Sequence, residues 1–169
     1  MLLLICSGFH DRTLSDRSIE RLRRASVRVD PYLILPPLTV IDRVPSPEEP
    51  LIAIGFSAGV VTAMANATLW RAFGGKVEAL FALDGWGVPL VGNFPIYRLS
   101  HDYFTHWSSL FLGGGAENFY ADPPADHLTL WSDPDRVAGW SDVAGTLDRT
   151  TALTFLSDRL ARHGLGIIN

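Results

Sequence analysis

A serine between two glycines is the feature of this sequence that most directly suggests chemistry. Residues 55–59 read Gly-Phe-Ser-Ala-Gly, the GxSxG pattern in which a sharp turn presents a nucleophilic serine. An apolar run at 51–54 precedes the pattern and an Ala-rich stretch follows it, as a strand-turn-helix unit requires. We therefore expect Ser57 above the carboxyl edge of a sheet. The simpler alternative is a tight turn in which Ser57 only caps the next helix.

A serine hydroxyl needs a general base, and the base needs an acid that fixes its tautomer. Asp84 directly follows the apolar run 77–83, and His127 follows the shorter run 118–121. If these runs are parallel strands, both side chains reach the same edge of the sheet as Ser57. As alternatives, Asp84 belongs to an ordinary Asp-Gly turn, and His127 is a loop or helix-start histidine.

Other residues compete for both roles. The other candidate bases are His10, His101, His106 and His163. His101 and His106 fall in an aromatic-rich stretch, and His163 comes after the last expected helix. Asp122 and Asp126 are alternative acids, but each is so close to His127 in sequence that facing its ring would need a tight loop. Asp84 is therefore preferred.

An oxyanion hole needs two backbone amides that point at one position. The amide of Ala58, directly after the serine, is one expected donor. The other is expected from Phe9 or His10, in the loop after the first apolar run, and His10 is better suited to a wall of the site than to the base. Phe56 and Trp86 adjoin the serine and the acid in sequence and are the expected substrate contacts.

The elements that position these residues alternate between short apolar runs and longer helical stretches. This alternation is typical of a mostly parallel sheet covered on both faces. Strands are expected at 2–6, 32–35, 51–54, 77–83 and 118–121. Helices are expected at 17–25, with Ser15 or Asp16 as N-cap, and at 58–73, 102–112 and 143–162. The sequence thus predicts one α/β domain over residues 1–169, a three-layer αβα sandwich around about five strands.

About half of the aromatic residues crowd into the segment 86–120. The segment lies between the candidate acid and the candidate base in sequence. We expect it either to cover the site and bind an apolar acyl group or to pack as ordinary core.

Composition excludes several classes of protein. The chain has 169 residues, 47% of them apolar and 19% charged, which disfavours a disordered protein. Its net charge of -4 disfavours nucleic acids and anionic membranes as partners. Arg17, Arg21, Arg24 and Arg28 share a helical face, but acidic residues lie among them, so we interpret it as a solvated face. Cys6 is the single cysteine, which excludes an internal disulfide and favours a reducing compartment.

No membrane-spanning or signal segment is evident, and we expect a cytoplasmic protein. No metal and no cofactor is expected either, because the sequence has no HExxH motif, no cysteine pair and no Gly-rich phosphate loop.

Taken together, the order of these residues resembles the α/β-hydrolase family over nearly the whole chain. The resemblance implies a serine hydrolase that cleaves an ester or thioester through an acyl-enzyme on Ser57, with His127 as general base and Asp84 as orienting acid. The substrate would be a small molecule, with an apolar acyl group as one option. The chain departs from many members in lacking early antiparallel strands and a His-Gly-Gly-Gly loop, and it resembles some lipase-like members in the early position of its acid.

Two other functions remain open from sequence. One is a flavodoxin-like binding module that holds a phosphate at the loop 7–13. The other is a hydrolase-like fold without activity that binds a partner. The sequence leaves the oligomeric state open.

Overall fold

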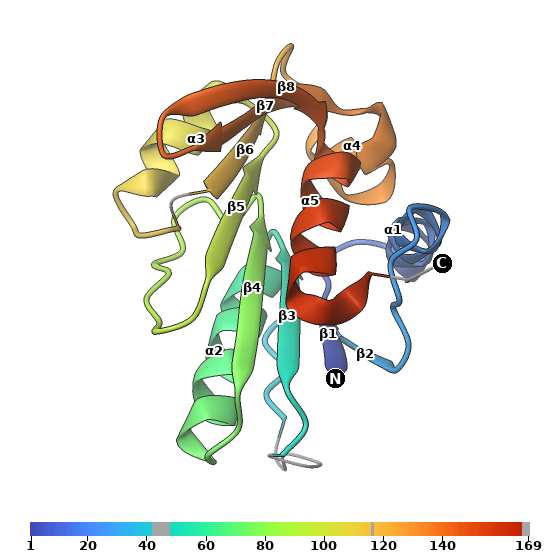
Figure 1. Cartoon of the computed structure of the whole chain (residues 1–169), viewed down its shortest axis with the longest axis vertical. Coiled ribbons are helices and arrows are strands. Elements are labelled where there is room, and N and C mark those ends of the chain that lie inside the picture. Colours follow the sequence, from blue (N-terminus) through green and yellow to red (C-terminus); the bar gives the residue numbers. More distant parts are fainter. Residues whose placement is uncertain (42–47, 116, 167–169) are drawn as a thin grey trace.

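The computed structural model describes residues 1–41, 48–115 and 117–166, and their elements are shown in Figure 1. The strands are β1 (Leu2–Cys6), β2 (Tyr32–Leu35), β3 (Leu51–Phe56), β4 (Val77–Leu83), β5 (Ile96–Ser100), β6 (Glu117–Ala121), β7 (Ala138–Val143) and β8 (Thr146–Thr151). The helices are α1 (Arg12–Arg24), α2 (Gly59–Ala72), α3 (Tyr103–Leu110), α4 (His127–Ser132) and α5 (Ala152–Leu160), with a 3-10 turn at Pro134–Arg136 and a π-helical turn at Ala161–Leu165.

All these strands form one mixed sheet in the order β2-β1-β3-β4-β5-β6-β7-β8. The pairs from β2 to β6 are parallel, whereas β7 and β8 are antiparallel to their neighbours. The prediction of an α/β fold is confirmed, but the sheet is larger than the expected five strands. Strand β5 and the hairpin of β7 and β8 were not predicted.

The expected helix over 143–162 is wrong in its first half. Residues 146–151 form β8, and α5 begins only at Ala152. Leu147, which fitted the helical spacing, is 48% exposed because it lies on an edge strand. Thr151 ends the strand and starts the helix, since its hydroxyl accepts a hydrogen bond from the Thr154 amide at 3.1 Å, which satisfies a free N–H of the first turn.

Helices cover both faces of the sheet. In Figure 1, α1 and α5 lie on one side and α2 lies on the other. Alternate residues of β1 divide between two apolar cores: Leu3 and Ile5 pack with α1 and α5, and Leu4 and Cys6 pack with α2. Burial raises the pKa of the Cys6 thiol to about 12, so this cysteine remains a neutral core side chain. None of the described helices is long and apolar enough to cross a membrane.

Helix α1 begins earlier than predicted. Its N-cap is Asp11, whose carboxylate accepts a hydrogen bond from the Thr13 amide at 2.8 Å, and not Ser15 or Asp16. Ser15 lies inside the helix and is buried, and its hydroxyl accepts from the indole N–H of Trp131 at 3.2 Å. Ser15 therefore connects α1 to α4.

The arginine face of α1 is only partly solvated, which corrects the interpretation made from sequence. Arg17 and Arg21 donate to the buried carboxylate of Asp133 at 2.6 and 3.0 Å. Burial by itself would raise the pKa of Asp133, but hydrogen bonds from Ser132, Arg21 and Arg17 lower it to about 2. These contacts fix α1 against the end of α4.

Arg98 is a charged residue in the middle of the sheet. It lies on β5, its side chain is 2% exposed, and its guanidinium donates to the carbonyl oxygens of Gly113, Val88, Leu112 and Gly85 at 2.5 to 3.4 Å. In the described part of the chain it has no carboxylate partner, and burial lowers its pKa to about 10. Arg98 thus ties the loop after β4 to the loop after α3.

We expect Arg98→Ala to lower the free energy of unfolding by about 3 kcal/mol, because it leaves buried carbonyl groups without donors and opens a cavity. Denaturant unfolding of both proteins measures the loss. The matched control is Arg71→Ala on the exposed end of α2, for which we expect a change within about 0.5 kcal/mol. Equal stability of the two variants would show that the Arg98 contacts contribute little.

Candidate active site

The order of the strands defines where a site is expected. Strand β1 lies between β2 and β3, so the chain leaves β1 in one direction through α1 and returns to its other side at β3. In open α/β sheets, ligands bind at the carboxyl ends of the strands where this direction reverses. The loop after β1 and the turn after β3, which carries Ser57, meet at this point.

The turn at Ser57 has the strained, tightly packed backbone that the GxSxG pattern predicts. Ser57 has φ 55°, a left-handed conformation that costs energy in a residue with a side chain. Both flanking glycines are required by space: a Cβ at Gly55 would lie 2.7 Å from the Cα of Val60, and a Cβ at Gly59 would overlap the carbonyl oxygen of Cys6. The structure thus places Ser57 on a tight strand-to-helix turn, as the sequence predicted.

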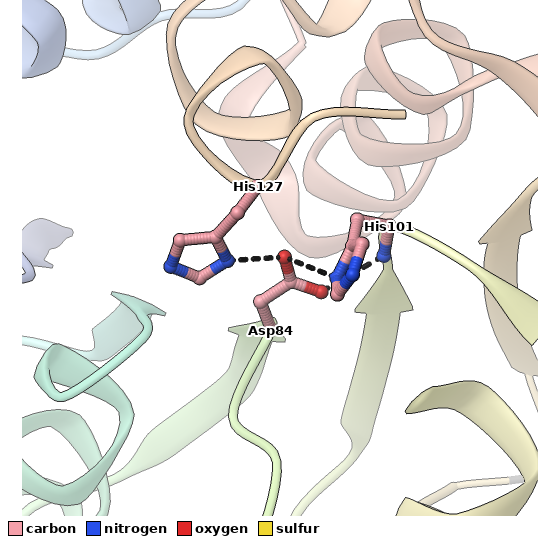
Figure 2. A group of neighbouring side chains, drawn as sticks. All are labelled: Asp84, His101 and His127. Atoms are coloured by element: carbon pink, nitrogen blue, oxygen red, sulfur yellow. Dashed lines mark hydrogen bonds and ion pairs between the residues drawn. The ribbon is translucent and has the colours of Figure 1, made fainter. Parts of the chain in front are cut away.

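Asp84 accepts three hydrogen bonds, which Figure 2 shows. Its Oδ2 lies 2.7 Å from Nδ1 of His127 and 2.9 Å from Nδ1 of His101, and its Oδ1 accepts from the backbone amide of His101 at 2.8 Å. An ionised carboxylate only accepts, so both Nδ1 atoms act as donors. In a neutral His127 this leaves Nε2 unprotonated and able to accept a proton.

These contacts hold Asp84 in its charged form. Its side chain is nearly fully buried, and burial by itself would raise the pKa of the carboxyl group. The hydrogen bonds from His101 and His127 outweigh burial, and the pKa of Asp84 lies below its ordinary value. The hydrogen bond to Asp84 raises the pKa of His101 against a smaller opposing effect of burial. The cluster therefore favours an anionic Asp84 and makes protonation of His101 easier than in a free imidazole.

The raised pKa of His101 predicts a pH-dependent contribution to stability. Asp84, Asp102 and Asp126 all favour its protonated form, while His127 faces it at a ring distance of 5.9 Å. The contribution is complete below the unfolded pKa of about 6.5 and is lost as the pH rises through the higher folded pKa. Solvent screens the partly exposed ring, so we expect about 1 kcal/mol or less.

The test is His101→Gln, whose amide can still donate to the carboxylate of Asp84. The difference in unfolding free energy between wild type and variant should be larger at pH 5.5 than at pH 9, as measured by denaturant titration at both values. A difference that is the same at both pH values, or larger at pH 9, would contradict the assignment of the raised pKa to His101.

His127 is the first residue of α4, directly after the loop that follows β6. Its ring packs on Phe56 with centroids 4.6 Å apart, and Phe56 stacks in turn on Trp131 at 5.2 Å. Phe56 is 1% exposed and does not line the cavity at Ser57, so it supports His127 from behind, whereas the sequence suggested a substrate contact. The orientation of the His127 imidazole is thus fixed by the ring of Phe56 and the carboxylate of Asp84.

The competing residues lie elsewhere or have other partners. The Asp122 carboxylate accepts from the indole N–H of Trp140 at 2.8 Å. His10 Nδ1 lies 2.8 Å from the carbonyl oxygen of Asp11, and His163 Nε2 lies 2.9 Å from the hydroxyl of Tyr97. His106 is buried against Tyr120 with ring centroids 4.8 Å apart, and Asp126 is the N-cap of α4. Among the described carboxylates, Asp84 is the one that contacts His127.

His101 is the site residue that sequence reasoning underrated. It follows β5 directly, so its side chain reaches the same edge of the sheet as Asp84. It was considered only as a competing base within the aromatic segment, because β5 itself was not predicted. Recognising residues 96–100 as a strand would have placed His101 beside the acid.

The loop after β1 contacts the elbow directly. A Cβ at Gly8 would lie 3.1 Å from the Cβ of Ser57, so a larger residue at position 8 would crowd this close approach. The amide of His10 already donates to the carbonyl oxygen of Gly8 at 3.0 Å. In the described part of the chain, no hydrogen bond engages the amide of Phe9 or that of Ala58. Of the two loop amides, that of Phe9 is therefore the one without a protein acceptor among the described residues.

A cavity of about 600 Å³ opens at Ser57. Its polar lining comes from the serine, the Asp84 cluster and Thr105, and its apolar lining consists of Ala58, Val61, Trp86, Val88 and Phe104. The Trp86 indole N–H donates to the hydroxyl of Ser108 on α3 at 3.1 Å, which holds the indole at the rim. Segment 86–120 therefore contributes Trp86 and Phe104 to the cavity lining and also supplies strand β5 and most of β6.

Asp84, His101 and His127 also offer one oxygen and two nitrogens within 4.8 Å of one another, a set that could hold a metal ion. The ligand atoms of a tetrahedral zinc site, each about 2.0 Å from the ion, lie roughly 3.3 Å apart. The oxygen-nitrogen distances of 2.7 and 2.9 Å are shorter than this and are those of charge-assisted hydrogen bonds. In this structure, hydrogen bonds from His101 and His127 to Asp84 therefore join the three side chains.

Comparisons with models of known protein families, with curated proteins and with solved structures find no match to this chain.

Proposed function

We propose that this protein is a serine hydrolase that cleaves an ester or thioester of a small molecule through an acyl-enzyme on Ser57. The observation that carries the proposal is the hydrogen bond between Asp84 and Nδ1 of His127, at the cavity into which the elbow serine opens. An anionic acid fixes the tautomer of the base, and the base and a strained serine line the same hollow. These are the parts that acyl transfer requires.

In the proposed mechanism, Nε2 of His127 takes the proton of the Ser57 hydroxyl while Oγ bonds to the carbonyl carbon of the substrate. The carbonyl oxygen becomes negative and accepts hydrogen bonds from the amides of Ala58 and Phe9. Its collapse breaks the bond to the leaving alcohol or thiol, which takes the proton from His127. Water then attacks the acyl-enzyme by the same route and releases the acid, and Asp84 stabilises the imidazolium at each step.

Two further features support the proposal. The serine, the acid and the histidine occur in the order Ser57, Asp84, His127, which is the order of the α/β-hydrolases that the sequence resembles. All three follow the carboxyl ends of strands in the parallel part of the sheet, namely β3, β4 and β6.

Pre-steady-state hydrolysis of p-nitrophenyl butyrate tests the function. An acyl-enzyme that forms faster than it hydrolyses gives a burst of one equivalent of nitrophenolate followed by a slower steady rate. We expect turnover that depends on Ser57, and a burst wherever deacylation is slow. A folded protein that cleaves neither nitrophenyl esters nor acyl thioesters of any chain length above background would overturn the proposal.

A further inference from the structure

Helix α2 is apolar on the side that faces away from the sheet as well as on the side that packs on it. Val60, Ala63 and Ala67 pack against the strands. The outer face carries Val61, Met64, Ala65, Thr68 and Leu69, and Arg71 is the single charged residue of the helix. A helix that covers a sheet normally has a charged outer face in contact with solvent. The uncharged outer face of α2 is therefore unusual for a helix in this position.

The outer face of α2 is hollowed. A groove of about 490 Å³ runs between these five outer residues and the loop residues Gly87, Val88 and Pro89. Val61 and Val88 also line the cavity at Ser57, so the groove and the cavity adjoin at these two residues. The lining of the groove contains no charged side chain.

We propose that this groove binds the acyl chain of the substrate, and that the protein acts on esters or thioesters of medium-length, unbranched acyl groups. The inference rests on the proposed function, because the groove starts at the cavity where the acyl carbon bonds to Ser57. An unbranched hydrocarbon chain fits an uncharged groove that follows one helix, whereas a charged or sugar-like acyl group would find no partners there.

The length of the groove determines how long an acyl chain it can hold. From Val61 to Thr68 the helix rises about 10 Å, and from Gly59, where α2 begins, to Thr68 about 13 Å. An extended chain of single bonds advances about 1.2 Å per bond, since three backbone bonds span roughly 3.5 Å. The groove therefore accommodates an acyl chain of roughly eight to twelve carbons that starts at Ser57.

The test is the kcat/KM of the wild-type protein for p-nitrophenyl esters from two to sixteen carbons. Full burial of a methylene group improves binding about fourfold, and an open groove should give about half of that factor. We expect kcat/KM to rise about twofold per methylene to an optimum near ten carbons and then to fall. A protein that hydrolyses the series with no preference beyond four carbons overturns the inference while leaving the proposed function in place.

Two substitutions test whether the acyl chain of the substrate lies in this groove. Ala65→Phe fills the middle of the groove, and we expect it to lower the ratio of kcat/KM for the ten-carbon ester over the four-carbon ester at least tenfold. Thr68→Phe fills the far end of the groove. Relative to the four-carbon ester, it should lower kcat/KM only for esters of about ten carbons or more. The matched control is Ala72→Phe, on the same helix outside the groove, which should keep the wild-type ratio. Ratios that do not change in either groove variant would contradict the placement.

A binding measurement separates the two proposals. Decanoate is titrated calorimetrically into Ser57→Ala and into the double variant Ser57→Ala, Ala65→Phe. We expect at least tenfold weaker binding by the double variant and a negative heat-capacity change for the single variant. If decanoate binding depends on Ala65 but the wild-type protein has no esterase activity, the hydrolase proposal is rejected and the groove proposal is kept. Equal binding by both variants would reject the groove.

Discussion

Ser57→Ala should reduce kcat for ester hydrolysis by about 10⁴-fold or more, to the level of nonspecific base catalysis, because it removes the hydroxyl on which the proposed acyl-enzyme forms. Ser57 and His127 both line the cavity, and Ser57 has a left-handed backbone with φ 55°. Steady-state rates and the disappearance of any nitrophenolate burst measure the effect.

The fold should tolerate this change. Alanine has no larger side chain than serine, and the hydrogen bond from the Ser57 amide to the carbonyl oxygen of Leu83 at 2.8 Å involves only backbone. We therefore expect an unchanged circular dichroism spectrum. The control is Ser157→Ala on α5, on the opposite side of the sheet from α2, which should retain wild-type kcat. Residual activity of Ser57→Ala above a tenth of the wild-type value would rule out this serine as nucleophile.

Asp84→Asn is expected to lower kcat by about 10⁴-fold. The substitution keeps the shape of the side chain but replaces an acceptor oxygen with an amide donor at the end of the acid. Nδ1 of His127 would then accept from the amide, so the ring proton would move to Nε2, the atom that must receive the proton of Ser57. Loss of the negative charge would also leave the imidazolium without its counter-ion.

The matched control for Asp84→Asn is Asp122→Asn. Asp122 follows β6 and precedes His127 by five residues, yet it contacts Trp140 and Arg149 and not the histidine. We expect it to keep kcat within about threefold of wild type, since it lies outside the acid-base pair. If Asp122→Asn is as damaging as Asp84→Asn, or if Asp84→Asn retains most of the activity, the acid has been misassigned.

Sequence reasoning reached the parts of this site that lie at the ends of strongly apolar strands. Strand β3 is a continuous apolar run, and β4 is apolar apart from Glu78 near its start. A buried parallel strand has this appearance because both of its faces are covered. The glycines around Ser57 and the aspartate after β4 then indicate the carboxyl edge of the sheet. This is why the elbow, Asp84 and its contact with His127 could be expected before the geometry was known.

Strands that lack this apolar continuity were missed. Strand β5 reads Ile-Tyr-Arg-Leu-Ser and contains Arg98, whose burial depends on carbonyl groups from two distant loops. Nothing local to residues 96–100 announces those partners, so tertiary contacts decide the assignment. Strand β8 is polar and exposed because it lies at the edge of the sheet. Because β5 was not predicted, the position of His101 as a second hydrogen-bond partner of Asp84 was not predicted either.

Labelling with a fluorescent fluorophosphonate tests the central claim most directly. The activated Ser57 oxygen would bond to phosphorus as fluoride leaves, and intact mass followed by peptide mapping locates the adduct. We predict one adduct per chain on Ser57 in the wild type, none in Ser57→Ala, and labelling of His127→Ala slowed at least 100-fold. A folded wild-type protein that stays unlabelled, or an adduct that persists in Ser57→Ala, would contradict the account of an activated serine at this site.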